Sequence, residues 1–114
     1  MREVIKDRGR LEHMLSAIEN VEEFTRGIHE EDFVNSKLLS FAVVKNIEIV
    51  GGATYMLTKE FKESHQSIPW LVIEKMRHVL VHGYYTISPE KVWETVQEDL
   101  PVLKKQLTNL LAAM

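Results

Sequence analysis

The sequence predicts an all-α fold, in which about four long helices and one short helix form a single domain over residues 1–114. Apolar residues recur at steps of three and four along most of the chain, which is the helical period. Proline and capping residues stand where helices would begin, and no segment shows the two-residue alternation of a half-buried strand. With 114 residues, of which 45% are hydrophobic, the chain is long enough for one core and too short for two.

The first helix is predicted from Asp7 to Arg26, with Gly27 ending it. Its apolar side chains share one face, and they are Leu11, Met14, Leu15, Ile18 and Val21. A short turn of helix is expected around residues 30–34, and it leads to the second long helix.

The second long helix is predicted from Ser36, a suitable N-cap, to about Leu57. Inside it lie Gly51 and Gly52, and each glycine costs about 1 kcal/mol relative to alanine in a helix interior. Either the helix bends at this pair or another backbone comes close to it. Close packing is the interpretation we favour.

Two further helices are predicted in the second half of the chain. One begins near Pro69 and runs to about His82, where Gly83 lets the chain leave the helix. The last begins at Pro89, with Ser88 as its cap. Pro101 lies within the apolar stripe of this last helix and is expected to kink or split it, because proline lacks a donor and crowds the carbonyl four residues earlier.

Composition limits the function. The net charge of −3 and the pI near 5.9 argue against a broad basic surface for nucleic acid, so any RNA contact must be local. The chain has no cysteine, which excludes disulfides, thiolate zinc sites and cysteine nucleophiles.

The chain also lacks the signals of a membrane or secreted protein. No segment has the roughly 18–20 uninterrupted apolar residues of a membrane span, and the N-terminus lacks the apolar core of a signal peptide. We therefore expect a soluble, cytoplasmic protein.

The stretch from Arg77 to Tyr84 carries most of the chemistry. Arg77 and Tyr84 are seven residues apart and share a face if the helix persists, whereas His82 lies about 140° round from Arg77. A regular helix alone therefore keeps Arg77 and His82 apart. They converge if the helix unwinds before Gly83, or if a second copy of the chain supplies one of them, which predicts a homodimer.

An arginine and a histidine are a plausible pair for cleaving RNA without a metal. The ribose 2′-hydroxyl attacks the adjacent phosphate, so the reaction needs a group that moves protons near neutral pH and a cation for the developing charge. His82 suits the first role and Arg77 the second. The alternative is a surface ion-pair arginine beside a histidine that stabilises a helix end.

A metal site is the other chemistry to consider. If the helix is continuous, Glu74, His78 and His82 form a row on one face, and two histidines four residues apart make half of a zinc or nickel site. A third ligand has no evident place. We therefore predict no metal and no cofactor, with His78 supporting the arginine, His82 or the substrate.

Several separated motifs together resemble one family. Arg77-x4-His82-x-Tyr84 follows Ile68-Pro69-Trp70 and precedes Val92-Trp93 and Asp99-Leu100-Pro101, and residues 42–43 and 49–51 also agree. This pattern, over roughly residues 10–111, resembles the HepT toxins of the HEPN superfamily.

The resemblance implies a four- to five-helix, up-and-down HEPN bundle, a homodimer with the motif near its two-fold cleft, and metal-independent endoribonuclease activity, with tRNA as the expected substrate. It assigns catalysis to Arg77 and His82. It also implies a type VII toxin–antitoxin pair, in which an MntA-like nucleotidyltransferase silences the toxin by AMPylation of Tyr84.

Two positions depart from the family pattern. The residue after the motif arginine is often Asn in relatives and is His78 here, and many relatives carry Glu where this chain has Gly52. If that carboxylate orients the motif, the chain is a weakened ribonuclease or a non-catalytic HEPN subunit of a nucleotidyltransferase complex. A helical metal-binding enzyme is the third hypothesis.

Overall fold

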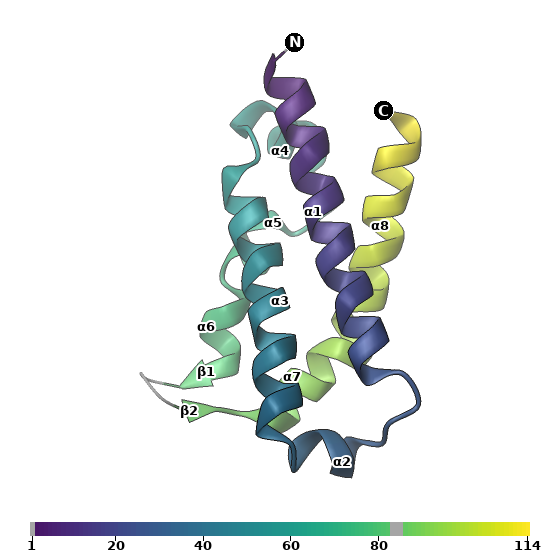
Figure 1. Cartoon of the computed structure of the whole chain (residues 1–114). Coiled ribbons are helices and arrows are strands. Elements are labelled where there is room, and N and C mark those ends of the chain that lie inside the picture. The colour runs from purple at the N-terminus through teal and green to yellow at the C-terminus, as the bar shows by residue number, and fades with distance from the viewer. Residues whose placement is uncertain (1, 83–85) are drawn as a thin grey trace.

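Four long helical segments run up and down beside one another in a computed structural model of the chain (Figure 1). The structure describes residues 2–82 and 86–114, and it describes side chains for residues 6–80 and 87–114. The segments are α1 (Arg2–Thr25), α3 (Lys37–Met56), α5 (Trp70–Glu74) with α6 (Met76–Leu80), and α7 (Pro89–Glu94) with the π-helix η1 (Thr95–Asp99) and α8 (Leu100–Ala113). The predicted all-α bundle is confirmed.

The first half of the chain folds as the sequence predicts. Helix α1 ends before Gly27, whose φ of 75° suits glycine, and the short helix α2 (Glu30–Val34) follows. Ser36 caps α3 by accepting a hydrogen bond of 3.1 Å from the backbone N of Leu39. These local signals fix where α1 ends and where α3 begins.

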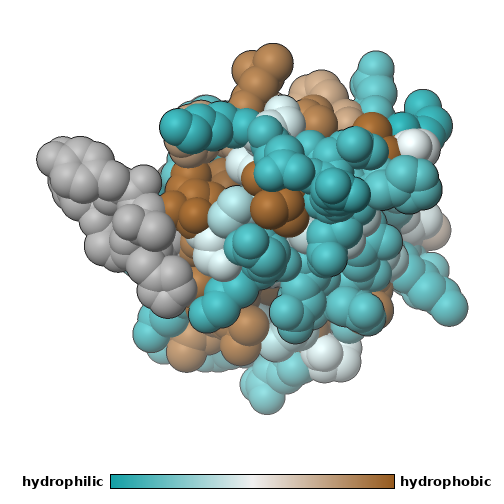
Figure 2. All heavy atoms as spheres, turned by 90° about the horizontal axis from the view of Figure 1, so that it is seen from below, coloured by the Kyte–Doolittle hydropathy of each residue, from teal (hydrophilic) through white to brown (hydrophobic). Residues whose placement is uncertain are grey.

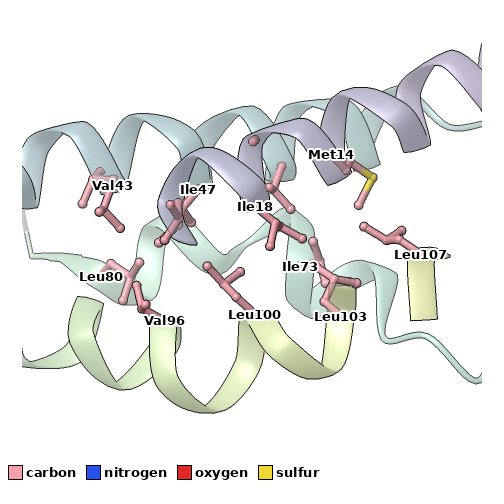
Figure 3. Packing of buried hydrophobic residues seen from close by; sticks show 14 of the residues in the cluster. Met14, Ile18, Val43, Ile47, Ile73, Leu80, Val96, Leu100, Leu103 and Leu107 are labelled. Carbon is pink, nitrogen blue, oxygen red and sulfur yellow. The ribbon is translucent and has the colours of Figure 1, made fainter. Parts of the chain in front are cut away.

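The core lies between α1, α3 and the α7–α8 segment (Figure 3). Met14 points from α1 towards Leu107, and Ile18 points towards Leu100 with Ile73 beside it. All of these side chains are buried, so they contribute through the removal of apolar surface from water. Hydrophobic residues also reach the surface among hydrophilic ones at the end of the bundle seen in Figure 2.

The prediction of one helix from Pro69 to His82 is wrong. The helix breaks at Lys75, α6 ends at Leu80, and Val81–His82 form the strand β1, paired antiparallel with β2 (Thr86–Ile87). The backbone N of Ser88 also donates to the Leu80 O at 3.1 Å. Val81, Thr86 and Ile87 in these two strands are β-branched, a residue type that is enriched in strands.

The last segment confirms the expected effect of Pro101. The helix is interrupted by the π-turn η1, and α8 then begins with the proline in its first turn. A proline supplies no N–H for a hydrogen bond to the preceding turn, and the π-helix η1 ends two residues before Pro101.

A short helix, α4 (Lys59–Ser64), was not predicted. Thr58 caps it, and Asp7 of α1 holds Thr58 by accepting hydrogen bonds from its backbone N at 2.9 Å and its Oγ1 at 2.7 Å. Asp7 is only 2% exposed, so this buried carboxylate fixes the α3–α4 corner against α1.

Among the described residues, no helix is both long enough and apolar enough to cross a lipid bilayer.

The two glycines of α3 have different surroundings. A Cβ added at Gly51 would lie 3.3 Å from the Ile73 O and 3.4 Å from the Glu74 O, both at the end of α5. A Cβ at Gly52 would have no atom of the described residues within 4 Å. Close backbone packing is therefore confirmed at Gly51, while Gly52 faces open space.

We predict opposite effects of alanine at the two glycines. Gly52→Ala should stabilise the fold by about 1 kcal/mol, because it raises helix propensity at no steric cost. Gly51→Ala gains the same propensity but crowds two carbonyls, and overpacking costs about 1–3 kcal/mol. Urea denaturation of both variants should place Gly51→Ala below Gly52→Ala, and equal stabilisation of the two would contradict this account.

Candidate functional site

An open cleft of about 480 Å³ lies between α3 and the α5–α6 segment, which run side by side in Figure 1. Its walls combine cations, carboxylates, two glycines, an aromatic ring and an aliphatic side chain. The lining residues are Glu48, Gly51, Gly52, Tyr55, Leu71, Glu74, Lys75, Arg77 and His78. A volume of this size is within the usual range for small-ligand sites.

Helix α3 contributes one wall as a single stripe. Glu48, Gly52 and Tyr55 are four and three residues apart, so they lie one above another on one face of the helix. Because Gly52 has no side chain, the middle of the stripe is bare backbone. This wall therefore has a carboxylate at one end, a phenol ring at the other and bare backbone between them.

The break at Lys75 shapes the opposite wall. The Lys75 N donates to the Leu71 O at 3.2 Å, and the His78 N donates to the Lys75 O at 2.9 Å, so the chain turns tightly between α5 and α6. After this turn, Arg77 and His78 both reach the cleft with exposed side chains. The turn that follows the Gly51 contact therefore leads to Arg77 and His78, whose side chains line the same cleft.

The charges in the cleft give it a locally positive character. Lys62 Nζ and Glu74 Oε1 form an ion pair at 3.1 Å, both mostly buried, which neutralises one of the two carboxylates. The cations Lys75 and Arg77 then face the single carboxylate of Glu48. The cleft therefore suits an anion although the chain as a whole is negative.

The structure brings Arg77 and His78 into one cleft with Lys75. The backbone of His82 lies in β1, immediately after α6, while its side chain and all of Tyr84 are outside the described parts of the chain. The predicted row of Glu74, His78 and His82 on one continuous helix face is wrong, because the break at Lys75 and the strand at His82 interrupt the helix.

The sequence interpretation did not assign Glu48, Tyr55 or Leu71 to the site. The spacing of Glu48, Gly52 and Tyr55 was a usable signal for the first two, since it is that of one helix face. Among the side chains that the structure describes, no three of His, Asp or Glu gather in a geometry that would hold a metal ion.

An apolar groove of about 290 Å³ lies on another side of the α5–α6 segment, between it and η1–α8. Val72, Val79 and Val102 line it with exposed side chains. Exposed apolar surface of this kind is typical of contacts between proteins. The α5–α6 segment therefore carries a polar cleft and an apolar groove.

The bundle and its cationic cleft define a small helical protein suited to binding an anionic ligand. A family model described as "Ribonuclease HepT-like" matches residues 14–110, and the chain therefore belongs to the HepT-like family of the HEPN superfamily, as the motifs predicted.

Named relatives are similar over most of their length. A protein of Thermococcus cleftensis named "Probable ribonuclease HepT" is 42% identical over 88% of this chain and 91% of its own. A "Putative RNase" of Caldanaerobacter subterraneus subsp. tengcongensis is 41% identical over 89% of this chain and 90% of its own. A third relative, a "Putative RNase" of Methanocaldococcus jannaschii, is 33% identical over 82% of this chain and 86% of its own. No solved structure matches the chain.

Proposed function

We propose that the protein is a metal-independent endoribonuclease toxin that cleaves RNA, with tRNA as the expected substrate. The observation that carries this proposal is the placement of Lys75, Arg77 and His78 in one open, locally positive cleft. The ribonuclease names of relatives that share the family support it.

The proposed reaction is an internal transfer at phosphorus. The 2′-hydroxyl oxygen bonds to phosphorus as the bond from phosphorus to the 5′-oxygen breaks, which leaves a 2′,3′-cyclic phosphate and a 5′-hydroxyl. His82 moves the proton, taking it from the 2′-hydroxyl or delivering one to the leaving oxygen. Arg77 binds the non-bridging oxygens and stabilises the charge that develops on them.

His78 serves this pair as a supporting residue. It lines the same cleft as Arg77 and is the next residue in α6, so it reaches the same bound phosphate or ribose. Lys75 adds a further cation at the cleft, and a cluster of this kind meets the need for a local, focused RNA contact in an acidic protein.

We further propose that a partner nucleotidyltransferase antitoxin of the MntA type silences the protein by transferring AMP from ATP to the hydroxyl of Tyr84, with pyrophosphate as the leaving group. Family membership supports this assignment, together with the motif Arg77-x4-His82-x-Tyr84. An AMP group near the motif adds a phosphate that Arg77 binds in place of RNA. Silencing then results from competition between the AMP phosphate and the RNA phosphate for Arg77.

A homodimer is proposed as the working form. The apolar groove beside α5–α6 supports it, because its valines are exposed in the single chain and lie on the segment that carries Arg77. A second copy that covers this groove would bring two copies of the α5–α6 segment near one axis.

The second candidate function is a non-catalytic HEPN subunit of a nucleotidyltransferase complex. Gly52 favours it, because the position opens on the cleft and offers no carboxylate where the family resemblance implies Glu. The two functions differ in whether the isolated protein cuts RNA, which makes cleavage the deciding readout.

Substitution of the proposed catalytic pair should abolish cleavage of tRNA in EDTA. We expect Arg77→Ala to lower the rate by about 10²–10³-fold, as for other lost transition-state donors. His82→Ala should lower it by about 10²–10⁴-fold, the usual range for general acid–base groups. Single-turnover cleavage with protein made without its partner measures both.

The matched control is His13→Ala, since His13 is an exposed histidine on α1 outside the cleft. It should cut at the wild-type rate. Absence of cutting by wild-type protein of unmodified mass would favour the non-catalytic subunit, and activity that is lost in EDTA would favour the metal-dependent alternative.

Modification should be selective for one of two adjacent tyrosines. With ATP and the partner nucleotidyltransferase, the wild-type protein and Tyr85→Phe should each gain mass in steps of one AMP and lose ribonuclease activity. Tyr84→Phe should keep its mass and its activity. Intact-mass spectrometry checks this, and full modification of Tyr84→Phe would contradict the assignment.

The dimer should depend on the apolar groove. Val102→Asp places a charge on a 59% exposed groove residue and should yield a monomer in sedimentation equilibrium, because a desolvated unpaired charge disfavours the interface. Leu38→Asp, at an 80% exposed position outside the groove, should remain dimeric. A dimeric Val102→Asp protein would move the interface elsewhere.

A further inference from the structure

The cleft has a part that phosphate binding does not use. Arg77, Lys75 and His78 account for an anion, but Tyr55, Leu71 and the bare backbone at Gly52 belong to the same cleft and carry no positive charge. Two of these side chains are large, apolar over most of their surface and exposed, Tyr55 at 71% and Leu71 at 63%. Exposed groups of this kind, next to cations, suit a ligand with both a flat apolar part and a phosphate.

Their positions define a slot. Tyr55 belongs to α3 and Leu71 to α5, so they come from the two sides of the cleft, and the backbone at Gly52, one turn before Tyr55 on α3, forms the base of the slot. Gly51 brings the two walls together through its contact with the Ile73 and Glu74 carbonyls. Gly52 keeps the base open, because no described atom lies within 4 Å of where its Cβ would be.

We propose that this slot binds one nucleobase of the RNA substrate, with the base stacked on the Tyr55 ring, flanked by Leu71 and resting on Gly52. Aromatic side chains are the usual stacking platforms for unpaired bases, and such stacking tolerates any base because every base has a π-face. This inference rests on the proposed function, since it names how the same cleft holds its RNA.

The slot also explains the absence of a side chain at Gly52. A side chain at this position would project from the α3 stripe between Glu48 and Tyr55, into the space that the base needs. Glu48 ends the stripe and offers a hydrogen-bond acceptor to the N–H groups on a base edge. The arrangement binds an unpaired nucleotide and requires the RNA to present one, as in a loop or a single-stranded end.

The test compares KM and kcat for cleavage of an RNA oligonucleotide. Tyr55→Ala should raise KM by about 5- to 150-fold with kcat little changed, which is the usual contribution of one stacked base converted to affinity. Tyr55→Phe should stay within about twofold of wild type, since it keeps the ring and loses only the hydroxyl. Gly52→Val, which fills the base of the slot, should raise KM as Tyr55→Ala does.

Phe24→Ala is the matched control, because Phe24 is an exposed aromatic residue on α1 outside the cleft, and it should leave KM unchanged. An unchanged KM in Tyr55→Ala would overturn the proposal. So would a Tyr55→Phe protein as impaired as Tyr55→Ala, because the hydroxyl and not the ring would then be responsible.

A binding measurement tests this inference independently of the proposed ribonuclease activity. Fluorescence anisotropy with the same oligonucleotide carrying 2′-deoxy sugars, which blocks cleavage, should show a similar loss of affinity in Tyr55→Ala. If the wild type binds this probe through Tyr55 but cuts no RNA, the slot stands and the ribonuclease proposal fails. If Tyr55→Ala changes the sedimentation mass, a second copy covers the ring and the slot proposal is wrong.

Discussion

The approach of α5 to α3 at Gly51 is the contact on which the rest of the site depends. A Cβ at this position would lie 3.3–3.4 Å from the Ile73 and Glu74 carbonyl oxygens, so any larger residue would crowd this approach. The tight turn at Lys75 comes immediately after this contact in the chain, and Arg77 and His78 beyond the turn line the cleft. This backbone contact therefore limits how closely α3 and α5 approach each other at the cleft.

The second determinant is the distribution of charge within the cleft. An acidic chain is a poor partner for RNA over its whole surface, but at the cleft the Lys62–Glu74 ion pair removes one negative charge and leaves Lys75 and Arg77 facing Glu48. Exposed charges further away are screened at about 8–10 Å in physiological salt, so the local balance decides what binds. The apolar ring of Tyr55 then gives the cleft a preference for a base beside the phosphate.

Much of the fold was predictable because its signals are local. The Ser36 cap, Gly27 with its positive φ and Pro101 at the start of α8 each act within a few residues, and each acts as the sequence predicted. The prediction of a continuous third helix was wrong, and its break at Lys75 lies next to a tertiary contact. Gly51, more than twenty residues away in sequence, packs against the carbonyls at the end of α5, and periodicity cannot reveal such a contact.

The residues of the site were predictable only where they stand close together in the sequence. Arg77 and His78 stand out in a short motif, whereas Tyr55 and Leu71 become neighbours only when α3 and α5 pack together. Gly52 shows what the sequence reveals and what only the structure reveals. From sequence it is a departure from the family pattern, and in three dimensions it is open floor within the cleft.

The measurement that tests the central claim most directly is an NMR titration of the isotope-labelled protein with a short RNA made uncleavable by 2′-deoxy sugars. The account predicts that the amide shifts of Gly51, Gly52, Tyr55, Arg77 and His78 move together and saturate at one RNA concentration, because these residues line one cleft. Shifts confined to the groove residues Val72, Val79 and Val102, with the cleft unchanged, would contradict it.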